Sequence, residues 1–162
     1  MKKIISLVLC LSMFLSAVSL VYADNYSKFT DVPQDSWYYN DVYNAVELGI
    51  INGKSENTFA PEDNLTYAEA IKLAACMYQL YKEGSVYLVS GGSPWYQTYV
   101  DYCKSVGVIS KEYNYNENAT RAGYMEIFAD SLPSEAYSEI NTIPDGSIKD
   151  VKDDSPYSAA VY

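Results

Sequence analysis

Apolar residues recur at helical spacing in two stretches that match each other along the chain. One stretch runs from Trp37 to Gly49 and the other from Trp95 to Gly107. Both intervals are 12 residues long, and the apolar positions superpose at an offset of 58. Apolar residues at i, i+3 and i+4 predict a helix, and a glycine after them favours the left-handed residue that ends one. The sequence therefore predicts two matching helices, each ended by a glycine.

A second helix follows a loop in each copy. The first of these begins at Thr66, which forms the pattern of a capping box with Glu69 three residues later. The other begins at Thr120. Apolar residues continue at helical spacing over residues 71–81 in the first copy and 125–129 in the second. Each copy is thus predicted to be a helix, a loop and a capped helix.

The internal similarity divides the chain into repeats. Residues 24–84 form the first repeat and residues 85–142 a more degenerate second one. Near the end, residues 155–157 (Ser-Pro-Tyr) resemble residues 93–95 (Ser-Pro-Trp) at the start of the second helix pair. We therefore expect residues 143–162 to be the truncated start of a third repeat, without its loop and capped helix.

The N-terminus has the order of a secretory signal peptide. Lys2 and Lys3 precede an apolar run over residues 4–21, and small residues lead up to a cleavage site after Ala23. Residues 1–23 are therefore expected to direct export and to meet the membrane only transiently. The alternative is an uncleaved membrane anchor, because a run of about 18 residues lies at the short end of spanning length.

Composition narrows the classes of function. The chain has no histidine, so Ser-His-Asp, Cys-His and histidine–metal sites are excluded. It has a single arginine. The formal net charge of −10, which becomes −12 once the two leader lysines are lost, disfavours nucleic acid. The cysteines lack zinc-ligand spacing, and the acidic residues near the C-terminus lack the calcium-loop pattern. We expect no catalytic residues, no metal and no cofactor.

Two cysteines, Cys76 and Cys103, remain after cleavage of the leader. Export would permit a disulfide between them. Cys76 aligns with Asp130 and Cys103 with Ala45, so the two lie on non-equivalent faces of different helices. Two buried thiols are the favoured prediction, and a disulfide stays open as the alternative.

The first repeat resembles the S-layer homology domain. The residues that carry the resemblance are Phe29-Thr30-Asp31-Val32, Trp37, Ala45, Gly49-Ile50, Gly53, Phe59-Ala60-Pro61 and Leu65-Thr66-Tyr67-Ala68-Glu69. The resemblance implies an all-α fold in which helix–loop–helix repeats pack as an incomplete pseudo-threefold bundle. It also implies non-covalent anchoring to anionic secondary cell-wall polymers, often pyruvylated, at grooves between repeats.

The family signature before the second helix is Thr-Arg-Ala-Glu, and its arginine contacts the glycan. The resemblance gives this role to Arg121, which follows Thr120, although Gly123 stands where the glutamate belongs. In the first repeat Glu69 is present, but Tyr67 replaces the arginine. An arginine fork suits the planar carboxylate of a pyruvate ketal. At most one full-strength site is therefore expected.

The other candidate contacts have structural alternatives. Tyr67 either stacks on a sugar ring or covers a helix start. Trp37 and Trp95 either offer flat faces to a sugar or pack as repeated core residues, and the packing role is favoured. Gly53 lies in a loop that approaches ligand in the family, but a purely conformational role is the alternative. The complete set of candidate ligand contacts is Arg121, Thr120, Thr66, Tyr67, Gly53, Trp37 and Trp95.

Together these features predict a secreted protein of the cell surface, cell wall or S-layer that binds an anionic wall glycan and is not an enzyme. The alternative is a secreted structural or protein-interaction module. Such a module would oligomerise through the surface left open by the incomplete third repeat, with weak or no glycan binding. An exported enzyme is the least favoured class, since it would need catalytic sequence beyond Tyr162.

Overall fold

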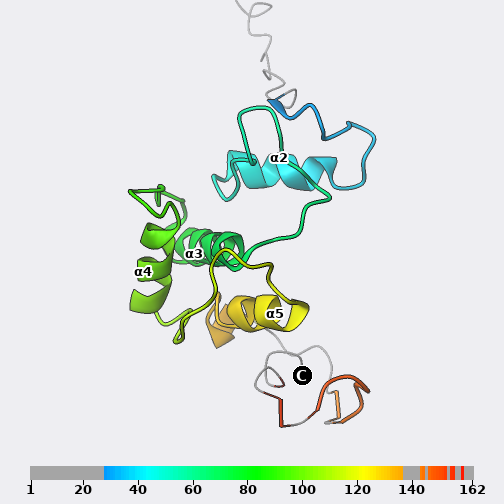
Figure 1. Cartoon of the computed structure of the whole chain (residues 1–162), viewed down its shortest axis with the longest axis vertical. Helices are drawn as coiled ribbons and strands as arrows, with labels where there is room; N and C mark the ends of the chain where they lie inside the picture. Colours follow the sequence, from blue (N-terminus) through cyan, green and yellow to red (C-terminus); the bar gives the residue numbers. More distant parts are fainter. Residues whose placement is uncertain (1–27, 137–142, 145, 153, 156–157, 159–162) are drawn as a thin grey trace, which may run out of the picture.

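The computed structural model is helical in the part of the chain that it describes, which comprises residues 28–136, 143–144, 146–152, 154–155 and 158. The elements in order are α2 (Tyr39–Glu47), α3 (Tyr67–Glu83), α4 (Gln97–Ser105), α5 (Arg121–Ala129) and a short 3₁₀ helix, η2 (Ser134–Ala136) (Figure 1). Within these residues, β-type pairing is confined to an isolated bridge between Thr66 and Asn118. The predicted all-α fold class is therefore confirmed.

Two predicted features lie wholly or partly outside the described residues. The signal peptide over residues 1–23 lies outside them entirely, and residues 143–162, predicted to begin a third repeat, lie within them only in part. The pseudo-threefold arrangement of repeats stays a prediction. Among the helices described, none combines the length and apolar character needed to cross a membrane.

The two short helices occupy matching places in the two repeats. Both α2 and α4 have 9 residues. Their first residues, Tyr39 and Gln97, are separated by the same offset of 58 that relates the apolar patterns. Gly49 and Gly107 follow the two helix ends with φ angles of 73° and 81°, which is the left-handed conformation that ends a helix. The two predicted helices and their glycine stops are confirmed.

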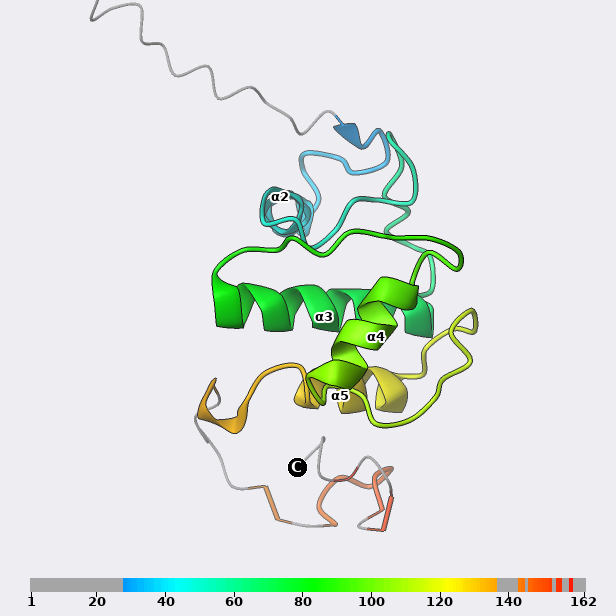
Figure 2. The ribbon, with the colours of Figure 1, turned by 90° about the vertical axis from the view of Figure 1, so that its left-hand side faces the viewer.

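The central helix of the main core is α3. It packs against both α4 and α5, and Figures 1 and 2 show these two helices on different sides of it. Ala70, Ala74 and Ala75 on α3 are fully buried, and their small side chains let the neighbouring helices approach. Bulk in this core comes from the other buried residues, which are Ile71, Cys76, Tyr99, Val100, Cys103, Val108, Ile109 and Ile127.

A smaller cluster holds α2 against the segments before and after it. Phe29, Val32 and Val42 are buried there, and Phe59 from the following loop packs on them with its ring centroid 5.6 Å from that of Phe29. Figure 2 shows α2 on the side of α3 away from α5. The loop between α2 and α3 is thus fixed to the first repeat's own core.

A buried glutamine fastens the segment between α3 and α4. The Oε1 atom of Gln79 accepts the backbone N–H groups of Tyr87 at 2.8 Å and Leu88 at 3.1 Å. Leu88 packs against the main core. The side chain therefore satisfies two backbone donors where the chain turns back along α3.

Both cysteines among the described residues are free thiols inside the main core. Cys76 on α3 and Cys103 on α4 are 1% and 0% exposed. Burial raises the pKa of Cys76, and burial together with the nearby Cys76 raises the pKa of Cys103 to about 12. The prediction of two buried thiols is confirmed.

These thiols should resist alkylation in the folded chain. Iodoacetamide reacts with thiolate, and a raised pKa leaves little thiolate at pH 8. We expect peptide mapping by mass spectrometry to find Cys76 and Cys103 unlabelled in buffer and fully labelled in urea. Rapid labelling of either residue in buffer would contradict this core.

Candidate functional site

The starts of α3 and α5 lie together where the two repeats meet. Thr66 caps α3 by accepting the N–H of Glu69 at 3.3 Å, and the Glu69 carboxylate accepts the N–H of Thr66 at 2.9 Å. This is the predicted capping box. Thr120 caps α5 in the same way, since its hydroxyl accepts the N–H of Gly123 at 3.0 Å.

The loop of the second repeat covers the first turn of α3. The N–H groups of Tyr67 and Ala68 donate to the carbonyls of Glu117 at 3.0 Å and Tyr115 at 2.9 Å. In the other direction, the N–H of Ala119 donates to the carbonyl preceding Thr66, that of Leu65, at 2.7 Å. With Glu69 bonded to its cap, the first three N–H groups of α3 are satisfied inside the protein. They are not open to a ligand.

Tyr67 lies between the two helix starts. Its ring packs against that of Tyr113 at a centroid distance of 5.0 Å and a tilt of 36°, and its hydroxyl lies 3.3 Å from the Thr120 hydroxyl. A Cβ added to Gly123 would come within 2.5 Å of the Tyr67 hydroxyl. Tyr67 in the first signature and Gly123 in the second therefore pack against each other, and Tyr67 covers the start of α5.

Arg121 is exposed at the first position of α5. Among the described residues, its guanidinium has neither a hydrogen bond nor an ion pair. The structure thus brings Thr66, Tyr67, Thr120 and Arg121 to one junction, where the arginine points its charge at solvent. Within the same described ranges, no group of three or more Cys, Asp or Glu side chains is placed to hold a metal ion.

A cavity of about 230 Å³ opens in the first repeat between the α2–α3 loop and α3. Its lining comprises Ile50, Ile51, Asn52, Gly53, Lys54, Phe59, Ala60, Pro61, Asp63, Asn64, Leu65, Glu69, Lys72 and Leu73. We call this space the repeat-1 pocket. It contains Gly53 from the predicted set, together with two lysines that the sequence analysis did not single out.

The two lysines of the repeat-1 pocket have different partners. The ammonium of Lys54 lies 2.5 Å from the Glu69 carboxylate. Burial opposes ionisation of Glu69, but hydrogen bonds from Lys54 and Thr66 outweigh it and hold the pKa of this carboxyl below its usual value. The ammonium of Lys72 lies 5.9 Å from the ring centroid of Tyr99 on α4. A pocket with an apolar wall and a lysine held in this way can bind an anion.

Backbone constraints shape the loop that walls the repeat-1 pocket. Gly53 has a φ of 82°, and a Cβ there would lie 2.4 Å from the Phe29 ring and 2.8 Å from the Thr58 carbonyl. Farther along, Asp31 accepts the N–H groups of Phe59 at 2.9 Å and Ala60 at 2.7 Å. These bonds lower the pKa of Asp31. The structure therefore gives Gly53 the conformational role that was its alternative.

The second repeat has Lys111 in place of this glycine, and its loop takes a different backbone there. Among described non-glycine residues only Ala60 has a positive φ, so Lys111 does not adopt the Gly53 conformation. Its ammonium lies 2.7 Å from both carboxylate oxygens of Glu126. Lys54–Glu69 and Lys111–Glu126 share a sequence separation of 15. That equal spacing is the signal from which both ion pairs could have been predicted.

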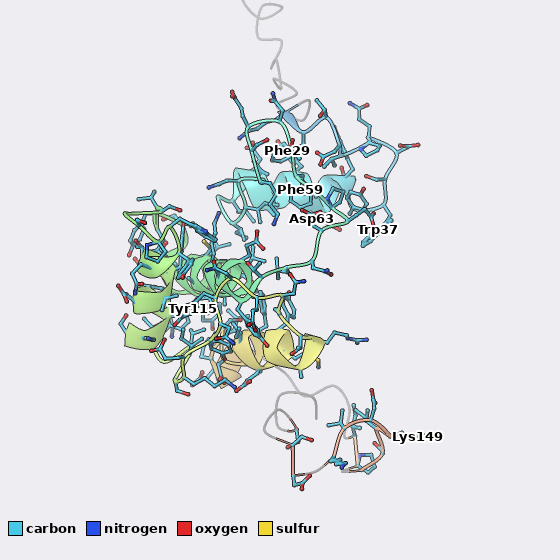
Figure 3. All side chains as sticks on the ribbon, viewed as in Figure 1. Phe29, Trp37, Phe59, Asp63, Tyr115 and Lys149 are labelled. Atoms are coloured by element: carbon cyan, nitrogen blue, oxygen red, sulfur yellow. The ribbon has the colours of Figure 1, made fainter. Side chains whose placement is uncertain are left out.

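The tryptophans do not fill equivalent core positions, so the favoured packing role is wrong for Trp37. This side chain is 87% exposed and meets only the edge of Tyr38 among described aromatic rings, at 5.4 Å. It precedes α2 in a turn, off the face that Val42 buries, and Figure 3 places it at the outer end of that helix. Trp95 is 40% exposed and lies edge-on to Tyr96 and Tyr99.

Residues 28–71 match the family model of the S-layer homology domain. The Surface-layer 125 kDa protein of Lysinibacillus sphaericus is 32% identical over 140 residues, which are 80% of this chain and 12% of that protein. The S-layer protein sap of Bacillus anthracis is 28% identical over 156 residues, 93% of this chain and 19% of that protein. An amylopullulanase of Thermoanaerobacterium thermosulfurigenes is 49% identical over 51 residues, 31% of this chain and 3% of the enzyme. The chain thus spans less than a fifth of the length of these relatives, and no solved structure matches it.

Replacing Gly53 by alanine should destabilise the fold more than replacing Gly84, which has a φ of 75° but nothing within 4 Å of an added Cβ. Left-handed backbone costs an alanine about 1–2 kcal/mol at either position, and overpacking adds about 1–3 kcal/mol at Gly53 alone. Urea unfolding measures both free energies. Equal losses for Gly53→Ala and Gly84→Ala would contradict the contact with Phe29.

The effect of Gly123→Ala should change sign with the residue at position 67. Opposite Tyr67 the added methyl group clashes and destabilises the fold. In a Tyr67→Ala background the clash is gone, and alanine stabilises the helix by up to about 1 kcal/mol relative to glycine. A double-mutant cycle by urea unfolding should give a coupling of at least about 1 kcal/mol. Additive effects would refute the shared packing.

Proposed function

We propose that this chain, whose residues 28–71 belong to the S-layer homology family, attaches a secreted protein to the bacterial cell wall by binding an anionic, pyruvate-bearing secondary polymer. The family match is the observation that carries the proposal. It covers α2, the α2–α3 loop and the first turn of α3, and so includes all residues that line the repeat-1 pocket except Lys72 and Leu73. Attachment at the cell surface follows from the match and from the S-layer relatives.

Binding here is attachment without catalysis. The matched segment is an anchoring module, and the amylopullulanase matches over 51 residues only, as an enzyme that carries such a segment. We place the signal peptide at residues 1–23 and the repeats at 24–84, 85–142 and, for the start of a third, 143–162. The α2–α3 and α4–α5 pairs fit the first two repeats.

Local cations have to overcome the charge of the whole chain. A net charge of −10 repels an anionic polymer, so attraction must come from cations that carry no internal partner. Arg121 is the best placed, because it is exposed at the start of α5, where the helix dipole also favours an anion. A guanidinium binds a carboxylate through two parallel hydrogen bonds. The exposed face of Trp37 offers a flat apolar surface for a sugar.

Arg121→Ala should weaken retention of the purified chain on cell-wall sacculi by about tenfold, since a hydrogen bond to a charged group contributes about 1.5–3 kcal/mol. The matched control is Lys82→Ala, which removes the same charge from the last turn of α3. Retention is measured by co-sedimentation over a range of sacculus concentrations. Equal losses for both variants would exclude a specific contact by Arg121, and no retention of the unaltered chain would refute the proposed function.

A further inference from the structure

An asparagine stands directly before a glycine in the loop between α2 and α3. Asn52 and Gly53 form this pair, and every other asparagine of the chain precedes a residue that has a side chain. The offset of 58 takes the pair to Ser110 and Lys111, so the second repeat lacks it. Glycine brings no Cβ to hinder its own backbone nitrogen, and its backbone is the least restricted of all residues. Asparagine is itself a thermolabile residue type, so the pair is the most reactive one in the sequence.

The reacting groups of this pair are accessible in the folded chain. Asn52 and Gly53 are both exposed and lie outside the helices. In the part of the chain that the structure describes, neither the side-chain amide of Asn52 nor the backbone N–H of Gly53 makes a hydrogen bond. Asn44 differs, because it lies inside α2, where the helix fixes the backbone nitrogen that follows it. The backbone nitrogen of Gly53 is therefore free to approach the side chain before it.

Packing keeps a glycine at position 53. The φ angle there is 82°, and an added Cβ would lie 2.4 Å from the Phe29 ring. A bulkier residue after Asn52 would slow attack on its side chain, but it would also strain this loop. The reactive pair is thus a consequence of the contact that shapes the first repeat.

We propose that Asn52 is a site of spontaneous deamidation and that its conversion weakens attachment to the wall. The backbone nitrogen of Gly53 gives its proton to a base in the solvent and attacks Cγ of Asn52, and the side-chain nitrogen leaves as ammonia. Water then opens the succinimide ring at either carbonyl. Cleavage of the bond between Cγ and nitrogen gives aspartate, and cleavage of the original peptide bond gives isoaspartate. The sum is asparagine plus water to acid plus ammonia, without oxidation or reduction.

Both products change the loop. Each adds a carboxylate to the wall of the repeat-1 pocket, which Asn52 lines. Isoaspartate also lengthens the main chain by a methylene group directly before Gly53, where the Phe29 ring and the Thr58 carbonyl leave no space. Lys54 follows at once, and its N–H donates to that same carbonyl at 2.8 Å. The lengthened chain cannot keep all of these contacts, so the loop loses its fit to the first repeat.

These changes oppose attachment of the whole chain. The net charge is already −10, and a further carboxylate adds to the repulsion of an anionic polymer. The displaced loop lies within residues 28–71, the segment that matches the family model. Because ammonia is lost, the change runs in one direction, and retention should fall as the protein ages. This consequence rests on the proposed function, whereas the deamidation itself does not.

Ageing the full chain in warm, mildly alkaline buffer tests the reaction. Trypsin cuts after Lys28 and Lys54, so that Asn40, Asn44 and Asn52 fall in one peptide. We expect mass spectrometry with fragmentation to find the amide-to-acid mass change at Asn52 alone, as a mixture of aspartate and isoaspartate that forms faster at higher pH. An Asn52 that keeps its amide in buffer, whether or not it converts in urea, would overturn the inference.

Sacculus retention before and after ageing tests the consequence. The unaltered chain should lose retention in proportion to conversion, and fresh Asn52→Asp should show the part of that loss which charge alone causes. The matched control is Asn52→Ser, which places the residue of the second repeat, Ser110, in the loop and should keep its retention through ageing. Unchanged retention of a converted chain, or an equal loss by aged Asn52→Ser, would overturn the link to attachment. A fresh unaltered chain without retention would instead refute the proposed function, while the mass change would still decide the reaction.

Discussion

The joint at the first turn of α3 holds the two repeats in register. A helix start carries donors that must be satisfied, and here the donors of Tyr67 and Ala68 are taken by carbonyls of the second repeat's loop. Because these bonds fix the backbone at residue 67, they also fix where its side chain goes. The position of Tyr67 then decides that residue 123 is glycine and that the space between the helix starts is filled. The buried face of α3 adds the apolar contacts that make the joint stable.

Local patterns were enough to predict the helices but not the junction between them. Helical spacing, the capping threonines and the glycine stops act over a few residues, and the structure confirms each of them. The packing of Tyr67 on Gly123 joins residues of different repeats. When each signature is compared separately with the family pattern, Tyr67 and Gly123 therefore look like two unrelated departures. Trp37 was misjudged for a related reason. Equal placement in two repeats predicted equal packing, but its position in the turn before α2 leaves it exposed.

The candidate cations were only partly accessible to sequence reasoning. Arg121 was found because the family signature marks it. Lys54 and Lys72 were missed. Lys54 directly follows Gly53, whereas Lys111, which forms the corresponding ion pair in the second repeat, aligns with Gly53 itself. The two ion pairs have the same separation along the chain, but they do not occupy aligned positions. In the second repeat the lysine lies one residue away from the aligned position, and the carboxylate lies about one helical turn away. The folded loop shows that Lys54 is paired with Glu69, whereas Lys72 has no ion pair in the part of the chain that the structure describes.

The proposed attachment to a wall glycan rests on a few placed cations and an apolar surface in an acidic chain without histidine, and the two repeats contribute differently to it. The second repeat locks the first in place, and the first keeps an open pocket. The most direct test of the account is co-sedimentation of the unaltered chain with sacculi before and after chemical removal of the secondary polymer. Strong retention on intact sacculi that is lost on stripped ones is the predicted result. Equal retention on both would contradict polymer recognition.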